Sequence, residues 1–186
     1  MDFATLWNSA VPYAEFVRAS KLEHRGLWDG LYRLARVPEW ALGAVPPEAG
    51  LKLLVLAEDW CGDASNTIPV LARLADEAPG IELRILRRDE NPELMNRYLT
   101  NGTRSIPVVI ALDAEFNELG HWGPRPGALQ DWVMGERAKG RPKAELYPEI
   151  RKWYARDRGA TTLKEVLEVT GEWEAAGRDG SERGEQ

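Results

Sequence analysis

One stretch limits what this chain can fold into more than any other: residues 51–64, which read LKLLVLAEDWCGDA. The stretch opens with a short apolar run, the pattern of a strand that is buried on both faces. The residues Trp-Cys-Gly-Asp follow, and apolar side chains then recur at helical spacing from residue 66 to 78. A buried strand that leads directly into a helix predicts an α/β fold, with Cys61 at the junction between the two elements.

Cys61 is the only cysteine in the 186 residues. At the start of a helix, unpaired N–H groups and the positive end of the helix dipole lower the pKa of a thiol. However, Glu58, Asp59 and Asp63 lie within three residues of it, and each carboxylate disfavours the thiolate. We therefore expect a thiol of near-ordinary acidity. A single cysteine also excludes an internal disulfide and a metal site built from cysteines alone.

The junction resembles the thioredoxin family, whose signature is Trp-Cys-Gly-Pro-Cys. Pro69 lies eight residues after Cys61, where the helix of that family carries a kinking proline. Residues 103–107, TRSIP, are followed by VVI and resemble the family loop whose Ile-Pro bond is cis and faces the active cysteine. With Asp63 after Gly62, the segment resembles a bacterial branch of the family that carries Trp-Cys-Gly-Asp-Cys. The resemblance covers roughly residues 50–137 and implies a thioredoxin-like fold, a central mixed sheet flanked by helices.

Two positions depart from the family pattern. The second cysteine, which resolves the mixed disulfide in that family, is Ala64 here, so dithiol activity is not expected. The buried acid that assists proton transfer to and from the second cysteine is Val55 here. One thiol can still attack a disulfide, but an outside thiol such as glutathione must release it. A thiol that is only oxidised or capped would be a sensor instead.

The resemblance implies a site with Cys61 as the catalytic residue. The residues expected to contact substrate flank this thiol or lie in the loop opposite it: Trp60, Gly62, Asp63, Ile106 and Pro107. One hypothesis is a monothiol thiol–disulfide oxidoreductase that forms mixed disulfides with a protein or a low-molecular-weight thiol or disulfide. The other is a redox-inactive protein that holds a peptide or protein partner in the groove beside Pro107. Neither hypothesis requires a cofactor.

These residues also have purely structural interpretations. Cys61 could be a buried structural cysteine and Trp60 a core residue. Pro107 could be an ordinary trans proline at a strand start. Arg104 could offset the nearby acids or bind an anionic thiol substrate, but a solvated loop arginine is the favoured interpretation.

The two histidines carry little signal. His24 and His121 are far apart and show no ligand spacing, so we expect no metal site. His121 is also not expected to act on Cys61, because the family geometry puts the region after the last strand away from the thiol.

Within the core, the sequence predicts a strand at 81–86, a helix from Asn91 to Gly102, and strands at 107–112 and 116–122. A helix that carries Leu129, Trp132 and Val133 on one face follows these strands.

Helices are expected on both sides of the core. Residues 3–36 show helical spacing, with Pro12 at a helix start, and residues 37–50 read as a linker with one helical turn around Trp40. Residues 144–158 and 162–176 are predicted helices. Pro148 is expected in the first turn of the first helix. Thr162 and Glu165 are expected to form a capping box at the start of the second.

We therefore divide the chain into four parts. Residues 1–49 form an N-terminal helical extension packed on the core, 50–137 the thioredoxin-like core, 138–176 the C-terminal helices and 177–186 a disordered tail.

Charge and hydropathy limit the partners. The net charge of −6 argues against nucleic acid and anionic membranes as main partners. No apolar run approaches the length of a membrane span, and the N-terminus has neither a basic start nor a long apolar stretch. We therefore expect no signal peptide and a cytoplasmic location, where a lone thiol stays reduced.

Overall fold

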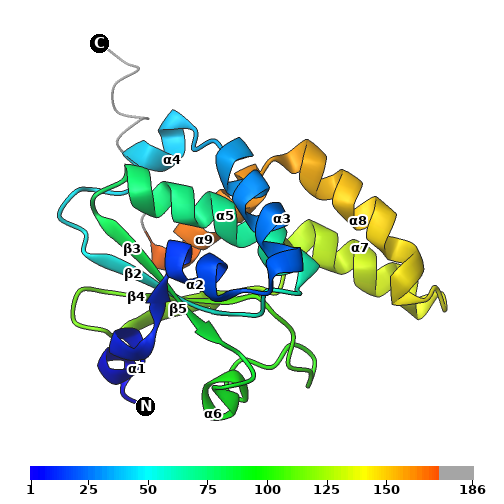
Figure 1. The fold of residues 1–186 in the computed structure, drawn as a ribbon, viewed down its shortest axis with the longest axis horizontal. Helices are drawn as coiled ribbons and strands as arrows, with labels where there is room; N and C mark the ends of the chain where they lie inside the picture. The colour runs from blue at the N-terminus through cyan, green and yellow to red at the C-terminus, as the bar shows by residue number, and fades with distance from the viewer. Residues whose placement is uncertain (172–186) are drawn as a thin grey trace.

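A five-stranded mixed sheet lies between two groups of helices in the computed structural model, which describes residues 1–171 (Figure 1). The strands are β1 (Val11–Pro12), β2 (Leu51–Ala57), β3 (Ile81–Arg87), β4 (Val108–Leu112) and β5 (Glu118–Trp122). Their order in the sheet is β1-β3-β2-β4-β5. Strand β2 runs parallel to β3, whereas the other neighbouring pairs are antiparallel. The fold is thioredoxin-like, as the sequence predicted.

The helices surround this sheet unequally. They are α1 (Phe3–Ser9), α2 (Tyr13–Ala19), α3 (Leu22–Leu34), α4 (Glu39–Gly43), α5 (Gly62–Glu77), α6 (Pro92–Met95), α7 (Gly127–Ala138), α8 (Lys143–Asp157) and α9 (Ala160–Thr170). Figure 1 shows α3, α4, α5 and α9 above the sheet and α1 and α6 below it. Helices α7 and α8 form a hairpin that extends from one end of the molecule.

The central position of β2 explains its continuous apolar run. All seven of its residues pair with β3, and five of them also pair with β4. Val55 is opposite Ile85 on one side and Val109 on the other, and all three side chains are buried. A strand in the middle of a sheet with helices on both sides has no polar face, so its sequence does not alternate.

The hairpin has a small core of its own. Its buried side chains form a cluster separate from the main core: Leu129, Val133, Leu146, Ile150 and Tyr154. Trp132 and Trp153 pack against this cluster and remain partly exposed. The buried side chains of α7 and α8 therefore pack mainly against one another, and individual polar contacts connect the hairpin to the rest of the molecule.

The N-terminal region contains the expected helices and one strand that the sequence did not predict. Pro12 stands directly before α2, as a helix start should, but Val11 and Pro12 also pair with Ile85 and Arg84 at the edge of the sheet. Two residues are too few to show an alternating pattern. The helical turn predicted near Trp40 is α4.

Two predicted helix boundaries are wrong. Helix α6 ends at Met95, whereas Asn101 and Gly102, with φ of 50° and 74°, form a turn closed by pairing between the residues on either side of them. Such left-handed residues suit a tight turn as well as a helix end. Pro148 lies inside α8 rather than in its first turn.

The predicted capping box is also wrong. Helix α9 follows Gly159, and Thr162 is a fully buried residue inside the helix. The carboxylate of Glu165 instead accepts hydrogen bonds from the Trp122 indole at 2.6 Å and from the backbone N–H of Gly127 at 3.0 Å. Glu165 thereby joins α9 to the end of β5 and to the start of α7. The predicted tail and the last residues of the predicted final helix lie outside the described residues.

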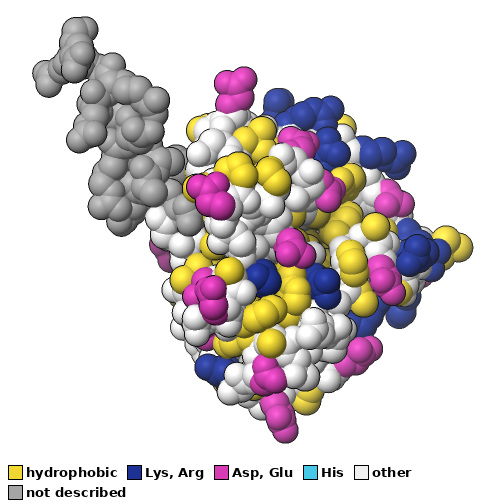
Figure 2. Space-filling model, turned by 90° about the vertical axis from the view of Figure 1, so that its left-hand side faces the viewer, with side chains coloured by type: hydrophobic (Ala, Val, Ile, Leu, Met, Phe, Trp, Pro, Cys, Tyr) yellow, Lys and Arg dark blue, Asp and Glu magenta, His cyan; other side chains and the backbone are white. Residues whose placement is uncertain are grey.

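Over residues 1–171, none of the helices combines the length and the apolar character that a membrane crossing requires. Figure 2 shows the end of the molecule opposite the hairpin, where acidic and basic side chains lie close together around hydrophobic ones.

Candidate functional site

Cys61 lies where the end of β2 meets the start of α5. The backbone N–H of Ala64 donates to its Sγ at 3.5 Å, so the sulfur caps the helix. On its other side the thiol donates a hydrogen bond to the backbone carbonyl of Ile106 at 3.4 Å. The peptide bond between Ile106 and Pro107 is cis. The structure therefore brings the cysteine and the loop of residues 103–107 together, although they are far apart in sequence.

The thiol is buried, which changes its acidity. The Cys61 residue is 8% exposed. Burial raises the pKa of the thiol, the N–H of Ala64 opposes this rise, and the nearby carboxylate of Asp63 adds to it. The near-ordinary acidity expected from the sequence is therefore wrong. The sequence identified the charges near Cys61, but it did not reveal how deeply the sulfur is buried.

Glu58 is one of the three acids near the thiol, and its carboxylate is occupied elsewhere. One oxygen accepts a hydrogen bond from the backbone N–H of Asp89 at 2.9 Å. The other pairs with the Arg87 guanidinium at 3.3 Å. Glu58 is buried, and these contacts join the end of β2 to the last residue of β3 and to the segment that follows it. Its role here is structural.

Asp59 is also buried and supports the N-terminal helices. Its Oδ2 accepts from the backbone N–H of Lys21 at 2.8 Å, and its Oδ1 lies 3.5 Å from Nδ1 of His24. Its backbone carbonyl accepts from the Trp28 indole at 2.9 Å. Burial raises the pKa of the Asp59 carboxyl, but the Lys21 N–H and the His24 side chain outweigh burial and lower it overall.

Asp63 is the third acid, and it is held by two residues from distant parts of the chain. Arg125 approaches it from the segment after β5, with Nε 3.2 Å from Oδ1 and Nη2 in contact with Oδ2. Tyr154 on α8 donates its hydroxyl to Oδ1 at 2.9 Å. Arg125 is only 9% exposed and also donates to Gln130 at 2.7 Å. We call Asp63, Arg125 and Tyr154 the Asp63 network.

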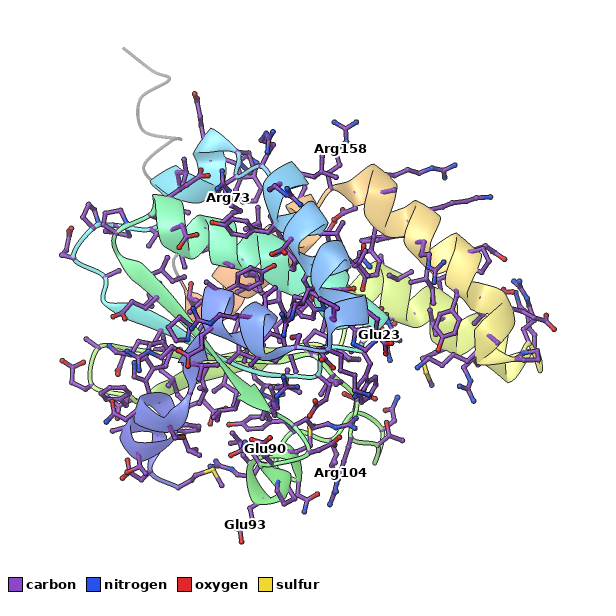
Figure 3. All side chains as sticks on the ribbon, in the orientation of Figure 1. Glu23, Arg73, Glu90, Glu93, Arg104 and Arg158 are labelled. Carbon is purple, nitrogen blue, oxygen red and sulfur yellow. The ribbon has the colours of Figure 1, made fainter. Side chains whose placement is uncertain are left out.

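Trp60 lies at the surface beside the thiol rather than in the core. It is 51% exposed, and the guanidinium of Arg88 lies 5.0 Å from the centre of its ring. Arg88 also donates to the backbone carbonyl of Arg104 at 3.1 Å, which connects this surface to the loop before Pro107. The exposed Arg104 donates to the side chain of Asn96 at 3.0 Å, and Figure 3 shows it on the side of the molecule that carries α6.

The remaining predicted site positions are simpler. Gly62 is the first residue of α5, and Ala64, at the lost resolving position, is fully buried in its first turn. His121 is half-exposed on β5 and packs edge-on against Tyr98. Across residues 1–171, no three His, Cys, Asp or Glu side chains are grouped so that they could hold a metal ion.

Two clefts lie away from the thiol. One of about 580 Å³ lies between α7 and α8 and is lined by Trp132, Trp153 and neighbouring polar side chains. The other, of about 670 Å³, lies between α2, α3, α5 and β3. Cys61 lines neither of them.

The Asp63 network contains the residues that sequence reasoning missed. Arg125 and Tyr154 lie 62 and 91 residues after Asp63 and belong to no recognisable motif. We expected the region after the last strand to lie away from the thiol, but Arg125, three residues after β5, contacts the carboxylate next to it. No local signal could have revealed this contact.

Comparison with known proteins supports the architecture. Residues 11–142 match a family model described as thioredoxin. The structure is similar to that of a protein of unknown function from Pseudomonas aeruginosa, with a TM-score of 0.71, 24% identity, and coverage of 91% of this chain and 96% of that one. It is also similar to an HIV epitope scaffold, with a TM-score of 0.72, 22% identity, and coverage of 91% and 97%. At these identities, the two structures support the fold alone.

Proposed function

The chain belongs to the thioredoxin family, and on that premise we propose that it is a monothiol thiol–disulfide oxidoreductase that acts through Cys61. The position of the sulfur carries the proposal. It lies between the first turn of α5 and the carbonyl of Ile106, next to Pro107. The helix start favours negative charge on the sulfur, and the loop offers backbone groups to an extended substrate segment.

The first step forms a mixed disulfide. The Cys61 thiol loses its proton to solvent, and the thiolate attacks one sulfur of a substrate disulfide. A bond forms between Sγ and that sulfur while the substrate disulfide breaks. The second substrate sulfur leaves as a thiolate and takes up a proton.

The second step needs a thiol from outside the chain, because Ala64 provides no sulfur. A low-molecular-weight thiolate attacks the substrate sulfur, a new disulfide forms between the two, and Cys61 leaves as a thiolate that is protonated again. The net reaction is thiol–disulfide exchange, and Cys61 is neither oxidised nor reduced overall. We also propose a cytoplasmic location, where low-molecular-weight thiols are abundant and reduced.

The raised pKa limits the rate of this chemistry. At neutral pH the thiolate fraction of Cys61 is smaller than that of a free cysteine, because burial favours the protonated form. The thiolate is the attacking species, so exchange should accelerate as the pH rises.

A second candidate function is a redox-inactive protein that binds a peptide or protein partner in the groove beside Pro107. The burial of Cys61 and its raised pKa favour this alternative. The exposed Trp60 would then serve as a contact surface for the partner.

A turnover assay separates the two functions. The substrate is a fluorescent cysteine peptide joined by a disulfide to 2-mercaptoethanol, and N-acetylcysteine is the external thiol. We expect the native protein to accelerate exchange above the uncatalysed rate, with an adduct on Cys61 detected by mass spectrometry. The Cys61→Ser variant should give the uncatalysed rate. If wild type and variant give the same rate, and the adduct forms only in urea, the oxidoreductase proposal is wrong and peptide binding is the better interpretation.

A further inference from the structure

The carboxylate of Asp63 is close enough to Cys61 to influence it, yet it is not a free charge. Its side chain is 11% exposed and contacts both the Arg125 guanidinium and the Tyr154 hydroxyl. The guanidinium is a permanent cation that engages both carboxylate oxygens, and the hydroxyl adds a donor to Oδ1. The charge beside the thiol is therefore compensated by residues outside the Trp-Cys-Gly-Asp segment.

Close packing fixes the segment that carries Arg125. Gly123 has a φ of 132°, and a Cβ on it would lie 2.1 Å from the backbone oxygen of Pro107. Arg125 is thus held against the loop that contacts the thiol. On the opposite side, Gln130 accepts a hydrogen bond from Arg125 at 2.7 Å and keeps its guanidinium oriented.

Ionisable side chains from three parts of the fold interact with the sulfur. Asp63 belongs to α5, Arg125 to the segment after β5, and Tyr154 and Lys143 to α8. Asp63 disfavours the thiolate, whereas the positive charges of Arg125 and Lys143 favour it. Glu58 and Asp59 have partners of their own, as described above.

We propose that Arg125 and Tyr154 are positioning residues for the Cys61 thiol: they hold and compensate Asp63, so that the thiolate forms at a lower pH than it would beside a free carboxylate. The α7–α8 hairpin thereby contributes to the reactivity of a cysteine on another element. The inference deepens the proposed function and rests on it, because thiolate formation has a consequence only where Cys61 reacts.

Thiolate absorbance near 240 nm tests the inference without requiring a reagent to reach the buried sulfur. Each variant is titrated from about pH 7 to about pH 11, and the matching variant that also carries Cys61→Ser is subtracted to remove tyrosine ionisation. Arg125→Gln removes the charge but keeps a polar side chain of similar length. We expect it to move the titration midpoint upward by about one pH unit.

Three further single variants and one double variant identify the cause of such a shift. Arg125→Lys keeps the charge and should restore most of the wild-type midpoint. Asp63→Asn should lower the midpoint, and Arg125→Gln should have a smaller effect in the Asp63→Asn background than in the wild type. Tyr154→Phe removes one oxygen while keeping the ring packed, so it should give a smaller upward shift in a folded protein.

The inference and the proposed function fail in different measurements. Coincident titration curves for wild type, Arg125→Gln and Arg125→Lys, in variants that retain the wild-type circular dichroism spectrum, would overturn the inference. An equal shift for both Arg125 variants would also overturn it. Arg125→Lys keeps the positive charge, so an equal shift would come from lost packing and not from lost charge. The proposed function fails instead in the turnover assay, whatever the titrations give.

Discussion

The sulfur of Cys61 lies 3.4 Å from the carbonyl oxygen of Ile106, although 45 residues separate the two in sequence. In this contact the thiol is the donor, and the contact is lost when the thiol ionises. A hydrogen bond to the neutral form disfavours the charged form, in the same direction as burial. The backbone N–H of Ala64 acts in the opposite direction, because it donates to the sulfur. The resting site therefore holds a protonated thiol at a position that also accommodates a thiolate.

The raised pKa of Cys61 predicts a loss of stability at high pH. The folded state binds the thiol proton more tightly than the unfolded state, whose cysteine titrates near about 8.5. This contribution to stability is fully present below that pH and disappears as the pH rises through the folded-state pKa. The free energy of unfolding of the wild type, measured in urea relative to Cys61→Ala, should therefore fall above about pH 8.5. Parallel pH curves for the two proteins would contradict the prediction.

Replacing Ala64 with cysteine should allow a disulfide to form between residues 61 and 64. Residue 64 lies in the first turn of α5, and its N–H already contacts Sγ of Cys61. We expect Ala64→Cys, after mild oxidation, to lose about 2 Da as an intramolecular disulfide forms. Both thiols should then resist alkylation until a reductant is added. Ala64→Ser is the matched control. Persistent double alkylation of the oxidised Ala64→Cys protein would show that the two sulfurs do not meet.

Gly123 should not tolerate a side chain. Its φ of 132° is unfavourable for other residues, and an added Cβ would meet the Pro107 oxygen at 2.1 Å. We expect Gly123→Ala to lower the free energy of unfolding by at least about 2 kcal/mol in urea titrations. The control is Gly26→Ala on α3, where the added methyl would meet nothing within 4 Å apart from the backbone of its own helix. That change should stabilise the protein by up to about 1 kcal/mol, because alanine favours helices. Similar effects of the two changes would contradict this view of Gly123.

Asp59 should contribute stability that acid removes. Its folded-state pKa lies below the usual value, because the Lys21 N–H and the His24 side chain outweigh burial. The contribution is present above the unfolded-state value of about 3.9 and is lost as the pH falls through the folded-state pKa. Asp59→Asn should therefore be less stable than the wild type near neutral pH, and the difference should shrink below about pH 4. Asp131→Asn, at an exposed position on α7, serves as the control. A difference that stays constant with pH would rule out this role.

The sheet and the position of the thiol could be predicted because their signals are local. The apolar run of β2 requires a strand with neighbours on both sides, and the segment after it starts a helix at Cys61. The resemblance of residues 103–107 to a known loop then predicted what lies opposite the sulfur. Burial was harder to predict, because it depends on how all of these segments pack together.

Other features had no local signal or a misleading one. Strand β1 has only two residues, too few for a pattern. Thr162 and Glu165 have the spacing of a capping box, but packing buries Thr162, and Glu165 binds Trp122 instead. The contact between Asp63 and Tyr154 joins common polar residues 91 positions apart, so only the folded chain reveals it.

The separate core of the α7–α8 hairpin has a consequence for how the molecule opens. Its five buried residues form a cluster apart from the main core, so the hairpin can unfold locally as a cooperative unit of its own. Amide hydrogens of α8 should exchange with solvent through such partial openings, while those of β2 require the whole domain to unfold. Tyr154 belongs to this cluster and donates to Asp63, so local unfolding of the hairpin would also remove a contact of the residue beside the thiol.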